Sequence, residues 1–233
     1  MQTQLNQFLA LVFFDVTAIV LDFVAESNYH HNIRWFFIHC CINTLVSILC
    51  LPDLLDCIND NDLCVRQEAS SRGSWATWLM LYGHLYHCLI FFRHLKWSEW
   101  FHHIVFCLPT SYFFYQQNSK IQVAMTYFTS GFPGAVDYFM LLLVKLEIIH
   151  SHRQKNLYYY LSAYIRSPGC LLACYLSLPY FFKYPDQYYY QNLFSTILVF
   201  LNGQYYNAKT CYDLGKKDSI IYPKKSLEVK KNN

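Results

Sequence analysis

The sequence predicts an all-α fold, a multi-pass bundle of about seven transmembrane helices. Of its 233 residues, 55% are hydrophobic and only 14% are charged, which is more apolar surface than a soluble fold of this size buries. The apolar residues also gather into segments that approach or exceed the roughly 20 residues needed to cross a bilayer. These segments are residues 5–25, 33–52, 74–92, 100–115, 121–144, 157–182 and 188–208.

The first segment reads as a helix that stays in the protein. It carries Asp15 and Asp22, and it lacks the basic start and small-residue cleavage site of a signal peptide. We therefore expect residues 1–32 to form an N-terminal transmembrane helix and a loop, ahead of a main membrane domain at residues 33–208.

The longest connection runs from Asp53 to Gly73 and is acidic. It carries Cys57 and Cys64, whereas most other cysteines lie in apolar segments, where cysteine behaves as a small hydrophobic residue. In an oxidising compartment this pair forms a disulfide or remains as two thiols at a helix end, and the sequence leaves both states open.

Three of the later segments are irregular. Residues 100–115 form the shortest segment, which either crosses the membrane or re-enters it. The fifth and sixth segments contain Gly131-Phe132-Pro133-Gly134 and Arg166-Ser167-Pro168-Gly169, where a proline removes a backbone donor, so we expect kinks or breaks. Because a bilayer tolerates a broken helix only where protein or a water-filled cavity satisfies the freed groups, both breaks predict an interior cavity.

Basic residues predict the orientation. With seven crossings, thirteen Lys and Arg residues fall on the side of the C-terminus and four on the other side, so the C-terminus should be cytosolic. Seven of the thirteen are lysines of the tail at residues 209–233, which has no stacked aromatic residues among them and reads as a solvated tail rather than a nucleic-acid surface. The last four residues, with Lys230 and Lys231, fit the KKxx pattern that coat proteins read, which predicts the endoplasmic reticulum membrane.

Histidines are concentrated between Gly83 and Tyr115, which hold five of the ten. His84 and His87 are three residues apart and share a helix face, beside Tyr86, so we expect these three to line a substrate site. His102 and His103 are adjacent, about 100° apart on a helix, so only one can point fully at that site.

An acidic residue supplies the third part of the predicted site. Asp137 lies inside an apolar segment, where a carboxylate is costly, so it should face the bundle interior and have a partner. A pair of Asp137 with His102 or His103 would form an oriented general base, and these three are the predicted catalytic residues. The alternative is that the same polar groups only hold helices together.

The sequence predicts no metal and no bound cofactor. It has one HxxH and one HH, too few nitrogens for the two metal ions of a membrane di-iron enzyme. It has no CxxC and no strong zinc spacing.

Two stretches carry a resemblance to a known family. HLYHCLIFFRHLKWSEWFHHIVFCLPTSYFF, followed by MTYFTSGFPGAVDYFMLLLVK, resembles the TLC domain of ceramide synthases and translocating-chain-associating membrane proteins. RWFFIHCCINTLVSILCLPDL, with His39, is similar to the opening of that domain. FHHIV is similar to the paired-histidine motif of ceramide synthases, whose later acidic motif has two acidic residues where this chain has only Asp137.

The resemblance implies a six-helix barrel over residues 33–208, preceded by one extra helix and open to the cytosol and the membrane. It also implies acyl transfer from a fatty acyl-CoA, as substrate, to an amine or hydroxyl of a membrane lipid such as a sphingoid base. His102 or His103 would then act as general base or transient acyl acceptor. The alternative is a non-enzymatic TLC protein that binds lipid, adjusts membrane composition or handles cargo.

Overall fold

The described part of the chain is almost entirely helical. The computed structural model describes residues 20, 23, 31–93 and 95–221, and these contain no β-strand, only an isolated bridge between Glu68 and Ser119. The prediction of an all-α fold is thus confirmed for these residues. The N-terminal segment at residues 5–25 lies almost wholly outside them, as do Lys230 and Lys231 of the tail.

The helices follow the predicted segments closely. In chain order they are α2 (His31–Asn59), α3 (Asn61–Arg66), α4 (Ser71–Ile90), α5 (Trp97–Phe101), η1 (His102–Cys107), α6 (Leu108–Gln117), α7 (Lys120–Thr126), η2 (Tyr127–Gly131), α8 (Phe132–Lys145), α9 (Ser151–Leu161), η3 (Ser162–Arg166), α10 (Ser167–Leu176), α11 (Leu178–Phe182) and α12 (Tyr189–Ile221).

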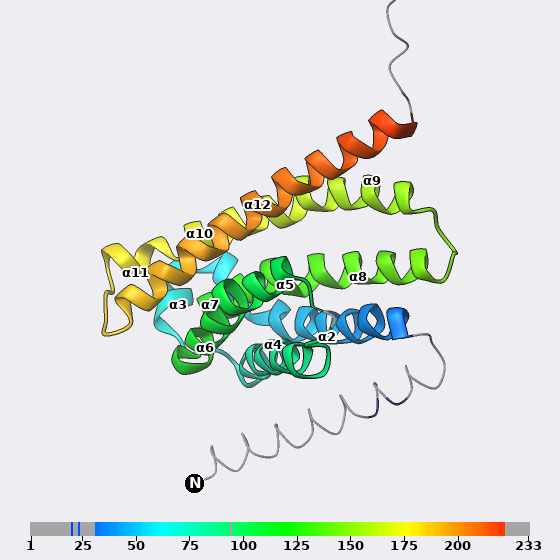
Figure 1. Cartoon of the computed structure of the whole chain (residues 1–233). Helices are drawn as coiled ribbons and strands as arrows, with labels where there is room; N and C mark the ends of the chain where they lie inside the picture. Colours follow the sequence, from blue (N-terminus) through cyan, green and yellow to red (C-terminus); the bar gives the residue numbers. More distant parts are fainter. Residues whose placement is uncertain (1–19, 21–22, 24–30, 94, 222–233) are drawn as a thin grey trace, which may run out of the picture.

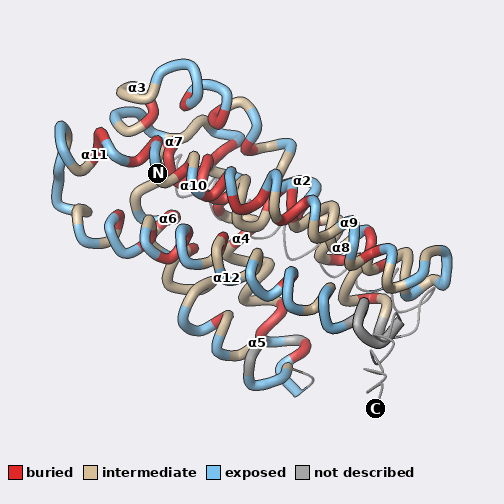
Figure 2. Tube along the Cα trace, turned by 90° about the horizontal axis from the view of Figure 1, so that it is seen from above, coloured by how far each residue is buried: buried red, intermediate tan, exposed pale blue. Residues whose placement is uncertain are grey.

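Helix α2 lies at the centre of one side of the bundle. It packs against α4, α7, η2 and α8, while α12 packs along α9 and α10 (Figure 1). The buried positions of α2, α7 and α10 face one another in the interior, and exposed positions run along the outer faces (Figure 2). Val46, Val123 and Cys170 are completely buried at these contacts.

Among the described residues, two helical runs are long and apolar enough to cross a membrane by length and composition, Ile33–Asn59 and Lys120–Lys145. The number of crossings therefore stays a prediction. In the second run the expected break does not interrupt the helix, because α7, η2 and α8 follow one another without a gap.

Each of the three wide π-helical turns ends two residues before a proline. The pairs are Cys107 and Pro109, Gly131 and Pro133, and Arg166 and Pro168. In each turn the closing amide reaches back five residues, as from Phe132 to the Tyr127 carbonyl. A proline ring clashes with the carbonyl four residues before it, and the wider turn makes room for the ring. At Pro133 and Pro168 the predicted kink or break is thus a wide π-helical turn within a continuous helix.

The backbone group released at Pro133 is satisfied by a side chain. In a regular α-helix the amide of residue 133 would donate to the Thr129 carbonyl, but proline has no N–H. Arg166 donates to this carbonyl instead, from Nη2 at 3.1 Å. The protein itself therefore compensates for the missing hydrogen bond.

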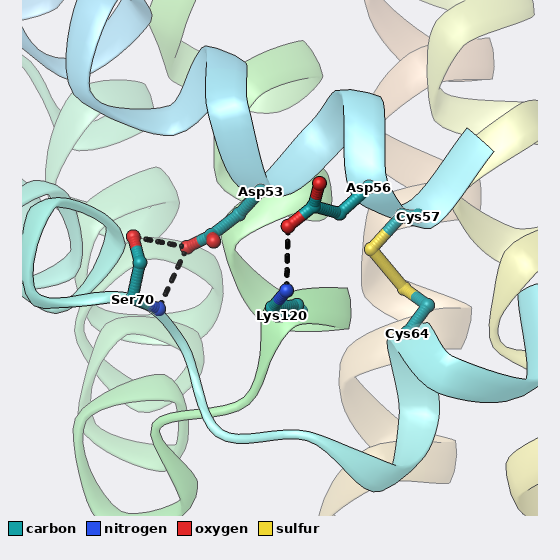
Figure 3. Close-up of a disulfide and its surroundings, with 6 residues drawn as sticks. All are labelled: Asp53, Asp56, Cys57, Cys64, Ser70 and Lys120. Atoms are coloured by element: carbon teal, nitrogen blue, oxygen red, sulfur yellow. Dashed lines mark hydrogen bonds and ion pairs between the residues drawn. A yellow bond between two sulfur atoms is a disulfide. The ribbon is translucent and has the colours of Figure 1, made fainter. Parts of the chain in front are cut away.

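One end of the bundle is held by polar and covalent contacts (Figure 3). Asp53 accepts hydrogen bonds from the amide and the hydroxyl of Ser70, both at 3.0 Å, and so joins α2 to the start of α4. The Lys120 ammonium lies 2.6 Å from an Asp56 oxygen and joins α7 to α2. Of the two states the sequence left open, the structure has the Cys57–Cys64 disulfide.

Candidate functional site

Five histidines from three elements meet inside the bundle. His39 comes from α2, His84 and His87 from α4, and His102 and His103 from η1. The ring centroids of His87 and His103 are 4.4 Å apart, those of His39 and His87 4.6 Å, and those of His84 and His103 5.3 Å. We call these five residues the histidine cluster. Because His39 and Cys57 are separated by 18 residues of one helix, the cluster lies about 27 Å from the disulfide along α2.

Hydrogen bonds define the tautomers on the α2 side of the cluster. His39 Nδ1 lies 2.9 Å from the carbonyl oxygen of Trp35, which can only accept, so Nδ1 of His39 carries the proton. In a neutral ring Nε2 of His39 is then bare, and it accepts from Nδ1 of His87 at 2.8 Å. The remaining nitrogen of His87, Nε2, therefore carries no proton and has a free lone pair. It is buried without a hydrogen-bond partner.

His102 makes two other contacts. Its Nε2 lies 3.1 Å from the Cys107 sulfur, and its Nδ1 lies 3.3 Å from the Tyr206 hydroxyl on α12. A ring held by a partner on each nitrogen has a defined orientation, which a general base requires.

A cavity of about 50 Å³ lies next to His102 and His84. All three π-helical turns contribute to its wall, with His102 and Cys107 from η1, Thr129 and Ser130 from η2, and Arg166 from η3. A volume of this size holds a few water molecules, since one water needs roughly 10–15 Å³. It therefore has room for a reacting group but not for a fatty acyl chain.

Arg166 is a buried cation at the wall of this cavity. It donates to the Tyr158 hydroxyl at 2.9 Å and to the Asn202 side-chain oxygen at 3.0 Å, besides the Thr129 carbonyl. Its guanidinium also lies 4.3 Å from the centre of the Tyr206 ring. Within the described residues its Nε–H has no acceptor, so one donor is left for a bound group.

Asp137 has a different partner from the one predicted. It accepts a hydrogen bond from Gln154 Nε2 at 3.1 Å. The described hydrogen bonds do not join it to a histidine, so a His–Asp pair is not formed in this structure. Asp137 on α8 is instead joined to Gln154 on α9.

The predicted site residues fall into two groups around the cluster. His84 and His102 line the cavity, while His87 and His103 lie in the cluster away from it. Tyr86 packs edge-on against Phe91 rather than lining the cavity.

Three residues that line or support the cavity are not predicted by the sequence: Cys107, Arg166 and Tyr206. Cys107 looks like the other cysteines of the apolar segments, although it lies four residues after His103. Arg166 could have been found, because a cation inside an apolar segment and close to a proline indicates a buried functional residue. Tyr206 gave no signal, because a tyrosine near a predicted membrane surface is ordinary.

Comparison with protein-family models, with curated proteins and with solved structures finds no significant match to this chain. The resemblance to the TLC domain thus rests on the sequence motifs alone.

Proposed function

We propose that this chain is a multi-pass endoplasmic reticulum membrane protein of the TLC type, which transfers an acyl group from a fatty acyl-CoA to an amine or hydroxyl of a membrane lipid. The observation that carries the proposal is a cavity lined by both His102, whose ring nitrogens each have a partner, and the buried cation Arg166.

The outer surface suits a lipid environment. Along α2 a stripe of large apolar side chains points outward, each at least 42% exposed: Leu45, Ile48, Leu51, Leu55 and Ile58. A similar stripe on α12 includes Leu193, Ile197 and Tyr205. Contiguous exposed apolar surface of this kind promotes aggregation in water, whereas the acyl chains of a bilayer would cover it. In the most apolar windows of the two long runs only 22% and 28% of residues are buried, unlike the core helices of soluble proteins.

The reaction needs a base and a group that stabilises negative charge. The acceptor amine or hydroxyl takes the place of the Tyr206 hydroxyl at Nδ1 of His102, and Nδ1 removes the acceptor's proton as the acceptor's lone pair attacks the thioester carbonyl carbon. The free Nε–H of Arg166 stabilises the negative charge that develops on the carbonyl oxygen. The carbon–sulfur bond then breaks, and His102 returns the proton to the departing coenzyme A sulfur, which leaves an amide or ester and a free thiol. The acyl chain itself would extend from the cavity into the lipid, because the cavity cannot hold it.

The test uses microsomes that contain the full-length protein, supplied with labelled fatty acyl-CoA and a panel of lipid acceptors that includes a sphingoid base. The wild-type protein should form product, and His102→Ala should lower the rate by about 10²–10⁴-fold, the usual contribution of a general base. His150→Ala, at an exposed position, is the matched control and should retain activity. Absence of product with every acceptor would overturn the proposal.

A second candidate is a non-enzymatic lipid-binding or membrane-composition protein. It is favoured by the small cavity and by the hydrogen bond of Asp137 to Gln154 rather than to a histidine. Under this candidate, His102→Ala lowers thermal stability or expression and leaves the cellular lipid profile unchanged.

Location is tested separately. A fluorescent fusion at the N-terminus should localise to the endoplasmic reticulum, and changing both Lys230 and Lys231 to serine should send it onward along the secretory route. An unchanged distribution in the variant would remove the proposed recognition by coat proteins.

A further inference from the structure

The donors on the inner side of the histidine cluster form a set typical of a metal site. The ligand atoms of His84, His103 and Cys107 all lie within 4.8 Å of one another. Bonds of about 2.0–2.3 Å to a tetrahedral zinc ion place ligand atoms roughly 3.3–3.7 Å apart. A contraction of about 1 Å, within the reach of side-chain rotation, would therefore bring these donors into coordination.

Two buried nitrogens of the cluster have no hydrogen-bond partner. They are Nε2 of His87 and Nδ1 of His103, in side chains that are 1% and 5% exposed. A buried polar atom without a partner costs about 1–3 kcal/mol, so native proteins seldom leave two of them side by side. Because Nδ1 of His87 donates to His39, Nε2 of His87 has a free lone pair, which a cation would satisfy.

The surroundings also resemble the outer shell of a metal site. A histidine that binds a metal usually donates its other ring N–H to a fixed acceptor, which orients the ring. His87 does so to His39, and His39 does so to the Trp35 carbonyl. On the sulfur side, His102 Nε2 is placed to donate to a Cys107 thiolate, with Tyr206 donating to the other nitrogen.

We propose that one zinc ion binds through three nitrogens and one sulfur. His84, His103 and Cys107 supply three of these ligands, and the unpartnered Nε2 of His87, whose ring lies 4.4 Å from that of His103, supplies the fourth. This donor set favours zinc, because imidazole and thiolate are its usual ligands and carboxylates are absent from the set. The Cys107 thiol gives up its proton as the zinc–sulfur bond forms. The ligands come from α4 and η1, so the ion links the two helices. This inference goes beyond acyl transfer and stands whether or not that activity is found.

The spacing of the ligands explains why the sequence predicted no metal. At least 15 residues, which include the turn between α4 and α5, lie between His103 and either His84 or His87. The HxxH and HxxxC pairs are each short, and only the packing of α4 against η1 brings them together.

The test measures metal content and spectra, not activity. The full-length protein, purified in detergent without added metal, should contain about one zinc per chain by mass spectrometry. Replacement with Co²⁺ should give the sulfur-to-cobalt charge-transfer band of a thiolate-bound ion, and Cys107→Ser should lose that band. Cys174→Ser is the matched control, since Cys174 is also a half-buried helical cysteine and lies on α10.

Further variants separate coordination from folding. His84→Ala and His103→Ala should lose the ion, and His39→Ala should weaken zinc binding about 10–100-fold, as expected for an outer-shell residue. If a variant does not fold, the wild-type protein alone tests the proposal. Removing zinc from the wild-type protein with a chelator should lower its thermal midpoint, and re-adding zinc should restore the midpoint. A wild-type protein that takes up no zinc, or a cobalt spectrum without the sulfur band, would overturn the proposal.

Discussion

At the scale of single residues, each of the main polar groups inside this bundle is held in position by contacts with several other residues. Arg166 has three hydrogen-bond acceptors and an aromatic ring, and His102 has a partner on each ring nitrogen. Such groups are costly to bury and are stabilised only when most of their hydrogen bonds are made. Their removal should therefore affect stability as well as activity.

Arg166→Lys should destabilise the protein. A lysine carries one ammonium in place of the planar fork, so it cannot reach Tyr158, Thr129 and Asn202 together or stack on Tyr206. Losing two hydrogen bonds to a charged group costs about 3 kcal/mol or more. This predicts a thermal midpoint lower by roughly 6–12 °C in detergent. The exposed control Arg153→Lys should leave the midpoint unchanged, and an equal effect of both changes would contradict the role assigned to Arg166.

Gly73→Ala should also destabilise the protein. A Cβ at this position would lie 2.0 Å from an Asp53 oxygen and 2.9 Å from Val123 Cγ2, so the corner between α2 and α4 would have to shift. Overpacking of this kind costs typically about 1–3 kcal/mol.

Gly215 on α12 is the matched control, because nothing lies within 4 Å of a Cβ at this position. Gly215→Ala should stabilise α12 by about 0.5–1 kcal/mol. Thermal unfolding of both variants gives the comparison, and equal shifts would be inconsistent with this packing.

At the scale of elements, the sequence was most informative about helices and least about their contacts. The apolar segments predicted α4 and the run from Lys120 to Lys145 closely, because length and hydropathy are local properties. The loop from Asp53 to Gly73 is shorter than expected, since α2 continues to Asn59 and α3 follows.

The site could be predicted only where its parts lie near one another in the chain. The approach of His84 and His87 to His102 and His103 follows from two consecutive helices packing together. His39 and Arg166 come from distant segments, and the spacing of residues contains no information about which helices meet. The cost of burying a carboxylate predicts that Asp137 has a partner but not which one, and in the structure that partner is Gln154.

Pro133→Ala should change the cavity through the π-helical turn η2. The new N–H at residue 133 can donate to the Thr129 carbonyl, in competition with Arg166. The turn should then relax toward a regular α-helix and move Thr129 and Ser130 at the cavity wall. Hydrogen exchange should show a protected amide at residue 133, and acyl transfer should fall at equal protein level.

Pro185→Ala, in an exposed loop, is the control for this change. An unprotected amide at residue 133 would show that the proline does not determine the turn.

At the scale of the whole molecule, the two ends of the bundle differ in chemistry. One end has the disulfide and the contacts of Asp53 and Asp56, and the other has the histidine cluster. In the proposed orientation the first end faces an oxidising lumen, where the disulfide can persist.

Changing Cys57 and Cys64 together to serine should cost about 2–3 kcal/mol, the value for closing a loop this short. The thermal midpoint should fall by roughly 4–12 °C. Reductant should lower the midpoint of the wild-type protein by a similar amount and leave that of the double variant unchanged. A reductant effect of equal size on both proteins would show that its target is another group.

The contacts at the disulfide end have a mechanical consequence. Two hydrogen bonds from Ser70 to Asp53 fix α4 to α2 there, next to the covalent bridge, so this corner can serve as a pivot. Displacement about a pivot grows with distance from it, and His39 lies about 21 Å from Asp53 along α2. At that end the hydrogen bond between His39 and His87 and the packing of the Trp35 ring against His87 join the two helices. An entrance for a lipid chain should therefore open beside the histidine cluster, with the smallest movement at Gly73.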